Sequence, residues 1–280
     1  HAAVYETPHM ILAAYMVTGF TVAGVYAAGI LRGRRDRYHG TGFALGFVPA
    51  AVLTPFQIFV GDTAARAIAH DQPVKFAAME YVPRTSRHVP EWLAGVYVNG
   101  HVYAGVKVPD LDSLLVGFGP GTKVTGWDSV PPAGRPPVVW LIHLCFDVMV
   151  GLGFLLLLAG LWALYEWWRR RRLPPQRAFW WAGAASGVAA VVAMECGWVV
   201  TEVGRQPWVV YRLQTTAQAA TGNGGVIASL TGVIVVYAVL GAATIAILRL
   251  LARRWRRGAP EEPAAVPYGP PARAPGRTAP

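Results

Sequence analysis

The sequence has 280 residues, of which 54% are hydrophobic and only 14% are charged, and its formal net charge is +10. Soluble domains usually carry about 25% charged residues, so this balance argues against a soluble enzyme and for a membrane protein. The large apolar fraction also excludes disorder for most of the chain. Cys145 and Cys196 both lie in apolar runs, so neither a disulfide framework nor a cysteine-based metal site is expected.

Five apolar runs are long enough to cross a membrane as helices, which takes about 20 mostly apolar residues each. None shows the alternation of a strand, so the predicted fold is all-α, a bundle of five transmembrane helices. Pro49 and Pro55 in the second run are expected to kink it. The runs are 10–31, 41–60, 138–165, 179–200 and 226–248.

These runs divide the chain into four parts. Residues 1–60 hold two spans, residues 61–137 form a long loop outside the membrane, and residues 138–250 hold three more spans. Residues 251–280 are rich in proline, alanine and glycine and are expected to form a disordered tail. The chain starts at His1 without the pattern of a signal peptide, and we interpret it as a fragment of a longer protein.

Arginine residues gather in three clusters beside the ends of the spans. The positive-inside rule predicts that these clusters face the cytoplasm, together with the tail, and that the long loop faces outward. The basic excess is then explained by topology, so no nucleic-acid partner is expected. The clusters are Arg32, Arg34, Arg35 and Arg37; Arg169, Arg170, Arg171, Arg172 and Arg177; and Arg249, Arg253, Arg254, Arg256 and Arg257.

Polar side chains inside spans are costly and therefore candidates for function. His9 opens the first span, and His143, Asp147 and Met149 lie in the third. Taken singly, a histidine at a helix end is more often interfacial, and a methionine in a span usually serves packing. His and Met together are axial ligands of haem iron, and a bundle core that also holds Glu202 favours a haem site.

A polar stripe runs along the fourth span. Glu195, Trp198, Glu202 and Arg205 recur at spacings of three and four residues, which places them on one helix face. A face turned to lipid would not carry two carboxylates and a guanidinium, so the stripe is expected to face protein, cofactor or water.

Lys75 and Glu80 follow the second span. The simplest interpretation is a solvated loop helix. The alternative is a site for the head group of a quinol, whose oxidation needs a hydrogen-bond acceptor and a route for two protons. Glu80 would be the acceptor, and Lys75 is expected to lower its pKa.

Three sequence runs resemble subunit I of the cytochrome bd-type quinol oxidases. They are QPVKFAAME at 72–80, FDVMVGLGF at 146–154 and GWVVTEVGRQPW at 197–208, of which the last is the most specific. The helix that begins with His9 is also similar to the helix that supplies a haem ligand in this family. The resemblance extends from His9 to about Leu250.

The resemblance implies a role for each matching residue. His9 and Met149 would be the axial ligands of low-spin haem b558, and Glu202 would ligate high-spin haem b595. Trp198 would lie beside the haems and Arg205 near their propionates.

The resemblance also implies a reaction. Lys75 and Glu80 would bind and oxidise quinol at the outer face, and electrons would pass through haems b558 and b595 to haem d, where oxygen is reduced to water. Protons released outside and consumed from inside would make the enzyme electrogenic without a proton pump. The implied partners are subunit II, a small accessory subunit, ubiquinol or menaquinol, oxygen and the lipid of a bacterial plasma membrane.

The sequence departs from the family pattern in two respects. The family subunit has nine spans, and this chain resembles the last five, so the axial ligand of haem d would lie outside it and the chain alone is expected to be inactive. Asp147 stands two residues before Met149, where the family often has arginine. Two alternatives remain open: a haem-free five-span transporter or scaffold, and a related subunit that has lost its chemistry.

Overall fold

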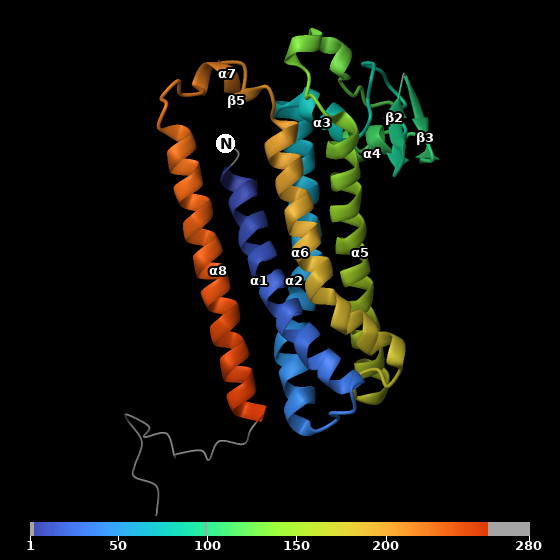
Figure 1. Cartoon of the computed structure of the whole chain (residues 1–280). Coiled ribbons are helices and arrows are strands. Elements are labelled where there is room, and N and C mark those ends of the chain that lie inside the picture. Colours follow the sequence, from blue (N-terminus) through green and yellow to red (C-terminus); the bar gives the residue numbers. More distant parts are fainter. Residues whose placement is uncertain (1–2, 99, 257–280) are drawn as a thin grey trace, which may run out of the picture. The chain divides into compact units, whose positions relative to one another are not determined.

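The computed structural model describes residues 3–98 and 100–256. The chain divides into two units, His1–Ala219 and Ala220–Pro280 (Figure 1). The first unit contains the helix bundle and the loop, and the described part of the second is mainly one long helix.

Five helices in the described part of the chain are long and apolar enough to cross a membrane. Four belong to the first unit and α8 to the second, which confirms the predicted all-α fold with five spans. They are α1 (Ala3–Leu31), α2 (Arg37–Asp71), α5 (Val139–Arg170), α6 (Arg177–Gly204) and α8 (Val226–Arg256).

Two helices extend beyond the predicted boundaries. Helix α2 continues through Pro49 and Pro55 to Asp71, so the beginning of the predicted loop 61–137 is helical. Helix α8 continues to Arg256, so the first residues of the predicted tail 251–280 are helical too. The rest of that tail, residues 257–280, lies outside the described residues.

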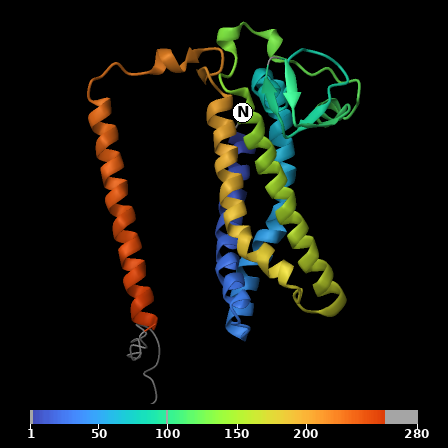
Figure 2. The same cartoon turned by 45° about the vertical axis from the view of Figure 1, so that its right-hand side comes forward.

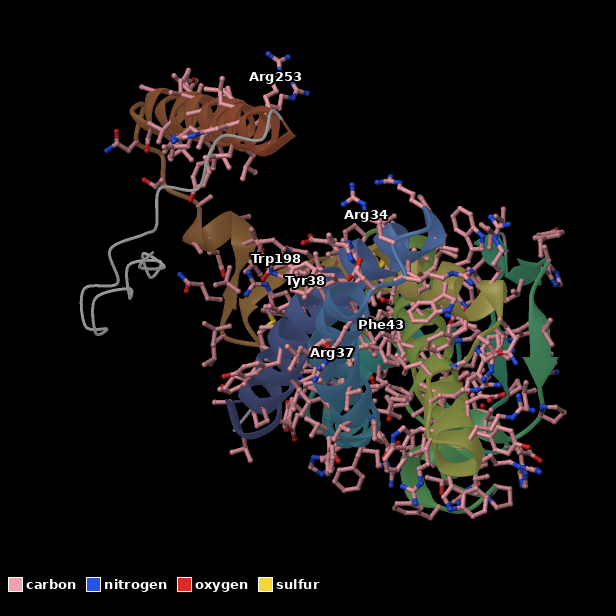
Figure 3. The ribbon with its side chains drawn as sticks, turned by 90° about the horizontal axis from the view of Figure 1, so that it is seen from below. Arg34, Arg37, Tyr38, Phe43, Trp198 and Arg253 are labelled. Atoms are coloured by element: carbon pink, nitrogen blue, oxygen red, sulfur yellow. The ribbon has the colours of Figure 1, made fainter. Side chains whose placement is uncertain are left out.

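Helices α1, α2 and α6 meet in an aromatic core. The rings of Phe43 and Phe47 on α2 stack with their centroids 4.9 Å apart, and Phe20 of α1 and Phe179 of α6 meet Phe47 edge-on. Figure 3 shows Phe43 lying between the helix ribbons. Since lipid tails are as apolar as these side chains, close packing rather than the hydrophobic effect holds such helices together.

Glycines allow α1 and α2 to approach closely. A Cβ atom on Gly46 would lie 2.6 Å from the carbonyl oxygen of Gly19, and one on Gly19 would lie 2.7 Å from the carbonyl oxygen of Gly46. Neither position has room for a side chain, as is typical of helix crossings in membranes.

The two ends of the helix bundle differ in character. The connections α1–α2 and α5–α6 lie at one end of the first unit, and the loop between α2 and α5 lies at the other (Figures 1 and 2). Two predicted arginine clusters therefore share one end, where Arg34 projects away from the ribbons (Figure 3). This arrangement agrees with the predicted topology, although which side is cytoplasmic stays a prediction.

The loop between α2 and α5 has its own small fold, with strands that the sequence reasoning did not predict. Strand β1 pairs antiparallel with β4, and β2 with β3. Its elements are α3 (Pro73–Met79), β1 (Glu91–Leu93), β2 (Val96–Val98), β3 (His101–Tyr103), β4 (Val106–Val108), α4 (Leu111–Gly117) and the 3₁₀ turns Trp127–Ser129 and Pro132–Gly134. After α6 come β5 (Trp208–Val210), β6 (Gln214–Thr215) and α7 (Thr216–Ala219).

Candidate functional site

Helix α3 places Lys75 and Glu80 inside the protein. The helix packs against α2, α5 and α6 at the loop end of the bundle. The side chain of Lys75 is only 5% exposed, and that of Glu80, the residue that ends α3, is 4% exposed. The interpretation of this segment as a solvated loop helix is therefore wrong.

Lys75 points toward the end of α6. A Cβ atom on Gly204 would lie 3.3 Å from Cγ of Lys75. Burial is the main reason that the pKa of Lys75 is lowered, and the nearby charges of Glu6, Arg205 and Glu202 act in opposing directions. Lys75 therefore shares its surroundings with two of the predicted haem-site residues rather than with Glu80.

The charges of other carboxyl groups act on Glu80. Burial raises its pKa well above the ordinary value, and the charges of Asp112, Glu91 and Asp147 raise it further. Its Oε2 atom is buried and has no hydrogen-bond partner among the described residues. The expectation that Lys75 lowers the pKa of Glu80 is wrong, because desolvation and like charges dominate at this position.

His143 joins α5 to the loop. The side chain is fully buried, and its Nδ1 donates a hydrogen bond to the carbonyl oxygen of Met79, 2.5 Å away. Its ring stacks on that of Tyr81 with a centroid separation of 3.8 Å. His143 thus fixes the end of α3, immediately beside Glu80.

Asp147 makes a second connection between α5 and the loop. Its carboxylate accepts a hydrogen bond from the backbone N–H of Ala94, between β1 and β2, and lies 3.3 Å from Nε2 of His143. Two residues before Met149, this chain therefore has a hydrogen-bond acceptor that holds the loop to α5.

His9 and Met149 are both half-buried, but each contacts a different helix. The Gln57 amide Nε2 lies 3.1 Å from Nε2 of His9, while Nδ1 of His9 is buried and has no hydrogen-bond partner in the described part of the chain. The sulfur of Met149 lies against Gly197 of α6, where a Cβ atom would be 2.8 Å away. An imidazole and a thioether are side chains of the kind that serve as axial ligands of a low-spin haem.

Glu202 and Arg205 pair with each other near the end of α6. The guanidinium Nη2 of Arg205 donates to Oε2 of Glu202 at 2.6 Å, and both side chains are exposed. Trp198, on the same helix, is 64% exposed. Their exposure leaves the polar stripe open to a further group. Among the described residues, no three His, Cys, Asp or Glu side chains form a group that could hold a metal ion.

Two carboxyl groups of the site escaped the sequence reasoning. Asp112 and Glu91 lie in the loop, and both act on the pKa of Glu80. The sequence feature that could have revealed Asp112 is its place as an acidic residue within the apolar segment LDSLLV at 111–116. A buried carboxyl in such a segment is unusual unless it is paired.

Comparison with known proteins gives a consistent result. A family described as cytochrome bd terminal oxidase subunit I matches residues 1–256. A Bacillus subtilis protein provisionally named cytochrome bd menaquinol oxidase subunit I is 29% identical over 246 residues, which cover 86% of this chain and 55% of that protein. The cytochrome bd ubiquinol oxidase subunit 1 of the same organism is 28% identical, with coverages of 91% and 56%.

A solved structure shares the fold. The bd oxidase from Geobacillus thermodenitrificans superimposes with a TM-score of 0.76 and 31% identity, covering 92% of this chain and 59% of that one. The chain therefore spans little more than half the length of the relatives it matches. The family match covers every described residue, and a solved bd oxidase shares the fold. The chain therefore belongs to the cytochrome bd terminal oxidase subunit I family.

Proposed function

We propose that this chain forms the quinol-oxidising and haem-binding part of subunit I of a cytochrome bd-type oxidase. The observation that carries the proposal is the burial of Lys75 and Glu80 at the loop end of a membrane-spanning bundle. Neither side chain has an ion-pair partner among the described residues, so both groups can interact with a bound ligand. The named substrates of the relatives, menaquinol and ubiquinol, fit such a site.

Glu80 would handle protons in this reaction. In its neutral form the carboxyl can donate a hydrogen bond to a quinol oxygen, and in its ionised form it can take the hydroxyl proton. The raised pKa of Glu80 keeps the group protonated until the pH is well above its ordinary range. Ionisation of this base is therefore shifted to higher pH, and proton transfer is expected to become easier as the pH rises.

The proposed haem ligands follow from the sequence resemblance. His9 and Met149 would hold haem b558, and Glu202 would hold haem b595 after its carboxylate leaves Arg205. Arg205 would then be free to pair with a propionate, beside Trp198. When bound, the haems would supply one-electron redox chemistry, and the axial ligand of haem d would lie outside this chain.

The remaining parts of the proposal concern the whole enzyme. Subunit II, a small accessory subunit, oxygen and lipid would be its partners. The loop would face outward from a bacterial plasma membrane and the tail would face the cytoplasm. Release of quinol protons outside and uptake of protons for oxygen reduction from inside would make the reaction electrogenic without a proton pump.

Quinol oxidation by the assembled oxidase tests the proposal. Glu80→Gln keeps the size of the side chain but removes the proton acceptor, so we expect at least a tenfold loss of quinol-dependent oxygen uptake with the haem content retained. Asp128→Asn is a matched control, because this loop carboxyl is exposed and bonds only Thr85. Wild-type kinetics in Glu80→Gln, or an oxidase without b-type haem by pyridine haemochrome analysis, would contradict the proposal.

A further inference from the structure

Asp112 is a second buried carboxyl in the surroundings of Glu80. Its side chain is 0% exposed, and both of its carboxyl oxygens lack a hydrogen-bond partner among the described residues. The same is true of Oε2 of Glu80. Buried polar atoms without partners are costly, so two such carboxyls in one site call for a role beyond packing.

The position of Asp112 is fixed by its neighbour in α4. Oγ of Ser113 accepts a hydrogen bond from the backbone N–H of Val89 and donates one to the carbonyl oxygen of Thr122, both at 2.9 Å. These bonds anchor the first turn of α4 to two other parts of the loop. The backbone at Asp112 is therefore held in place by the bonds of the next residue.

Negative groups surround Asp112. Burial, together with the charges of Glu91 on β1 and Asp147 on α5, raises the pKa of Asp112 to about 9. The charge of Asp112 in turn is the largest contribution from any neighbouring charge to the raised pKa of Glu80. The two carboxyls therefore interact, and ionisation of one opposes ionisation of the other.

The cationic groups on the neighbouring elements are engaged elsewhere. Arg66 on α2 pairs with Asp62 and lies over the ring of Phe118 at the end of α4. His88 lies 3.3 Å from Asp110, and His143 faces Asp147. No ion pair among the described residues reaches Asp112.

We propose that Asp112 is a further functional carboxyl of the quinol site, whose charge controls when Glu80 can take a proton from a quinol hydroxyl. The inference rests on the proposed function. In the step concerned, the O–H bond of the quinol breaks and an O–H bond forms on the Glu80 carboxylate, which leaves the quinol as its anion. When Asp112 is neutral, Glu80 ionises against fewer like charges; when Asp112 is ionised, Glu80 keeps its proton.

The pH dependence of quinol oxidation by the assembled oxidase tests this role. Asp112→Asn removes the charge with little change in shape, so the alkaline rise in activity is expected to move by about one unit to lower pH. Asp110→Asn is the matched control, since Asp110 lies two residues away and is exposed. Its profile should coincide with that of the wild type.

The outcomes separate the two proposals. A wild-type profile in Asp112→Asn, with Glu80→Gln impaired, overturns the role of Asp112 and leaves the quinol site standing. Full activity in Glu80→Gln overturns the quinol site itself. If Asp112→Asn does not fold, infrared titration of the Glu80→Gln variant tests the role of Asp112 instead. A band of a protonated carboxyl that disappears near pH 9 supports that role. The absence of such a band overturns the role.

Discussion

The sulfur of Met149 on α5 lies against Gly197 on α6, at a point where a Cβ atom would be only 2.8 Å from it. The glycine therefore provides the space that the proposed haem ligand occupies. Two substitutions follow from this contact, one that removes the thioether and one that displaces it.

Met149→Leu is expected to abolish the low-spin b558 band, because leucine has the size of methionine but no ligand atom. Gly197→Ala is expected to shift or broaden the same band, because its methyl group displaces the sulfur. Visible spectra of the reduced oxidase measure both. Gly153→Ala is the control, since its Cβ atom would meet nothing within 4 Å. An unchanged spectrum in Met149→Leu would reassign the ligand.

Gly46→Ala should destabilise the bundle. Its Cβ atom would lie 2.6 Å from the Gly19 carbonyl oxygen and 2.8 Å from the Ala23 nitrogen, which are backbone atoms that cannot move aside cheaply. Overpacking of this kind costs about 1–3 kcal/mol. Thermal unfolding in detergent should show a lower Tm than Gly40→Ala, whose Cβ atom would meet nothing within 4 Å. Equal Tm values would show that α1 and α2 can separate without cost.

Asp147→Ala should loosen the loop. The substitution leaves the N–H of Ala94 without its acceptor and removes a neighbour of His143. We expect faster limited proteolysis between β1 and β4, while Asp147→Asn, which keeps an acceptor oxygen, should be cut at the wild-type rate. Equal rates in all three proteins would mean that the hydrogen bond to Ala94 does not hold the loop.

The stability of the protein should fall as the pH rises toward 9. The folded state holds a proton on Asp112 up to about pH 9, whereas the unfolded chain releases it near the ordinary value of 3.8. The folded state therefore binds more protons in this window, and the free energy of unfolding falls by at most about 1.4 kcal/mol per pH unit for one such group. Asp112→Asn should flatten this dependence in Tm measurements between pH 5 and 9. If Tm of Asp112→Asn fell with pH as steeply as Tm of the wild type, this prediction would be contradicted.

The five apolar runs of the sequence were sufficient to predict the five spans. A helix in lipid must satisfy its own backbone hydrogen bonds, so each span is encoded locally, in a run of apolar residues. The family resemblance likewise depends on local strings, above all 197–208. The end of α2 was misplaced because an amphipathic continuation such as 61–71 no longer needs to be apolar throughout.

The surroundings of the site could be learned only from the tertiary structure. Lys75 and Glu80 are five positions apart, yet Lys75 lies near the end of α6, while Glu80 feels the charges of carboxyls on α4, β1 and α5. Sequence spacing suggested a Lys–Glu pair, but the pKa of a buried group depends on desolvation and on which charges the fold brings near it. Those charges come from segments far apart in the chain. Only the packing of these segments decides that the charge of Asp112 raises the pKa of Glu80 and that Lys75 does not lower it.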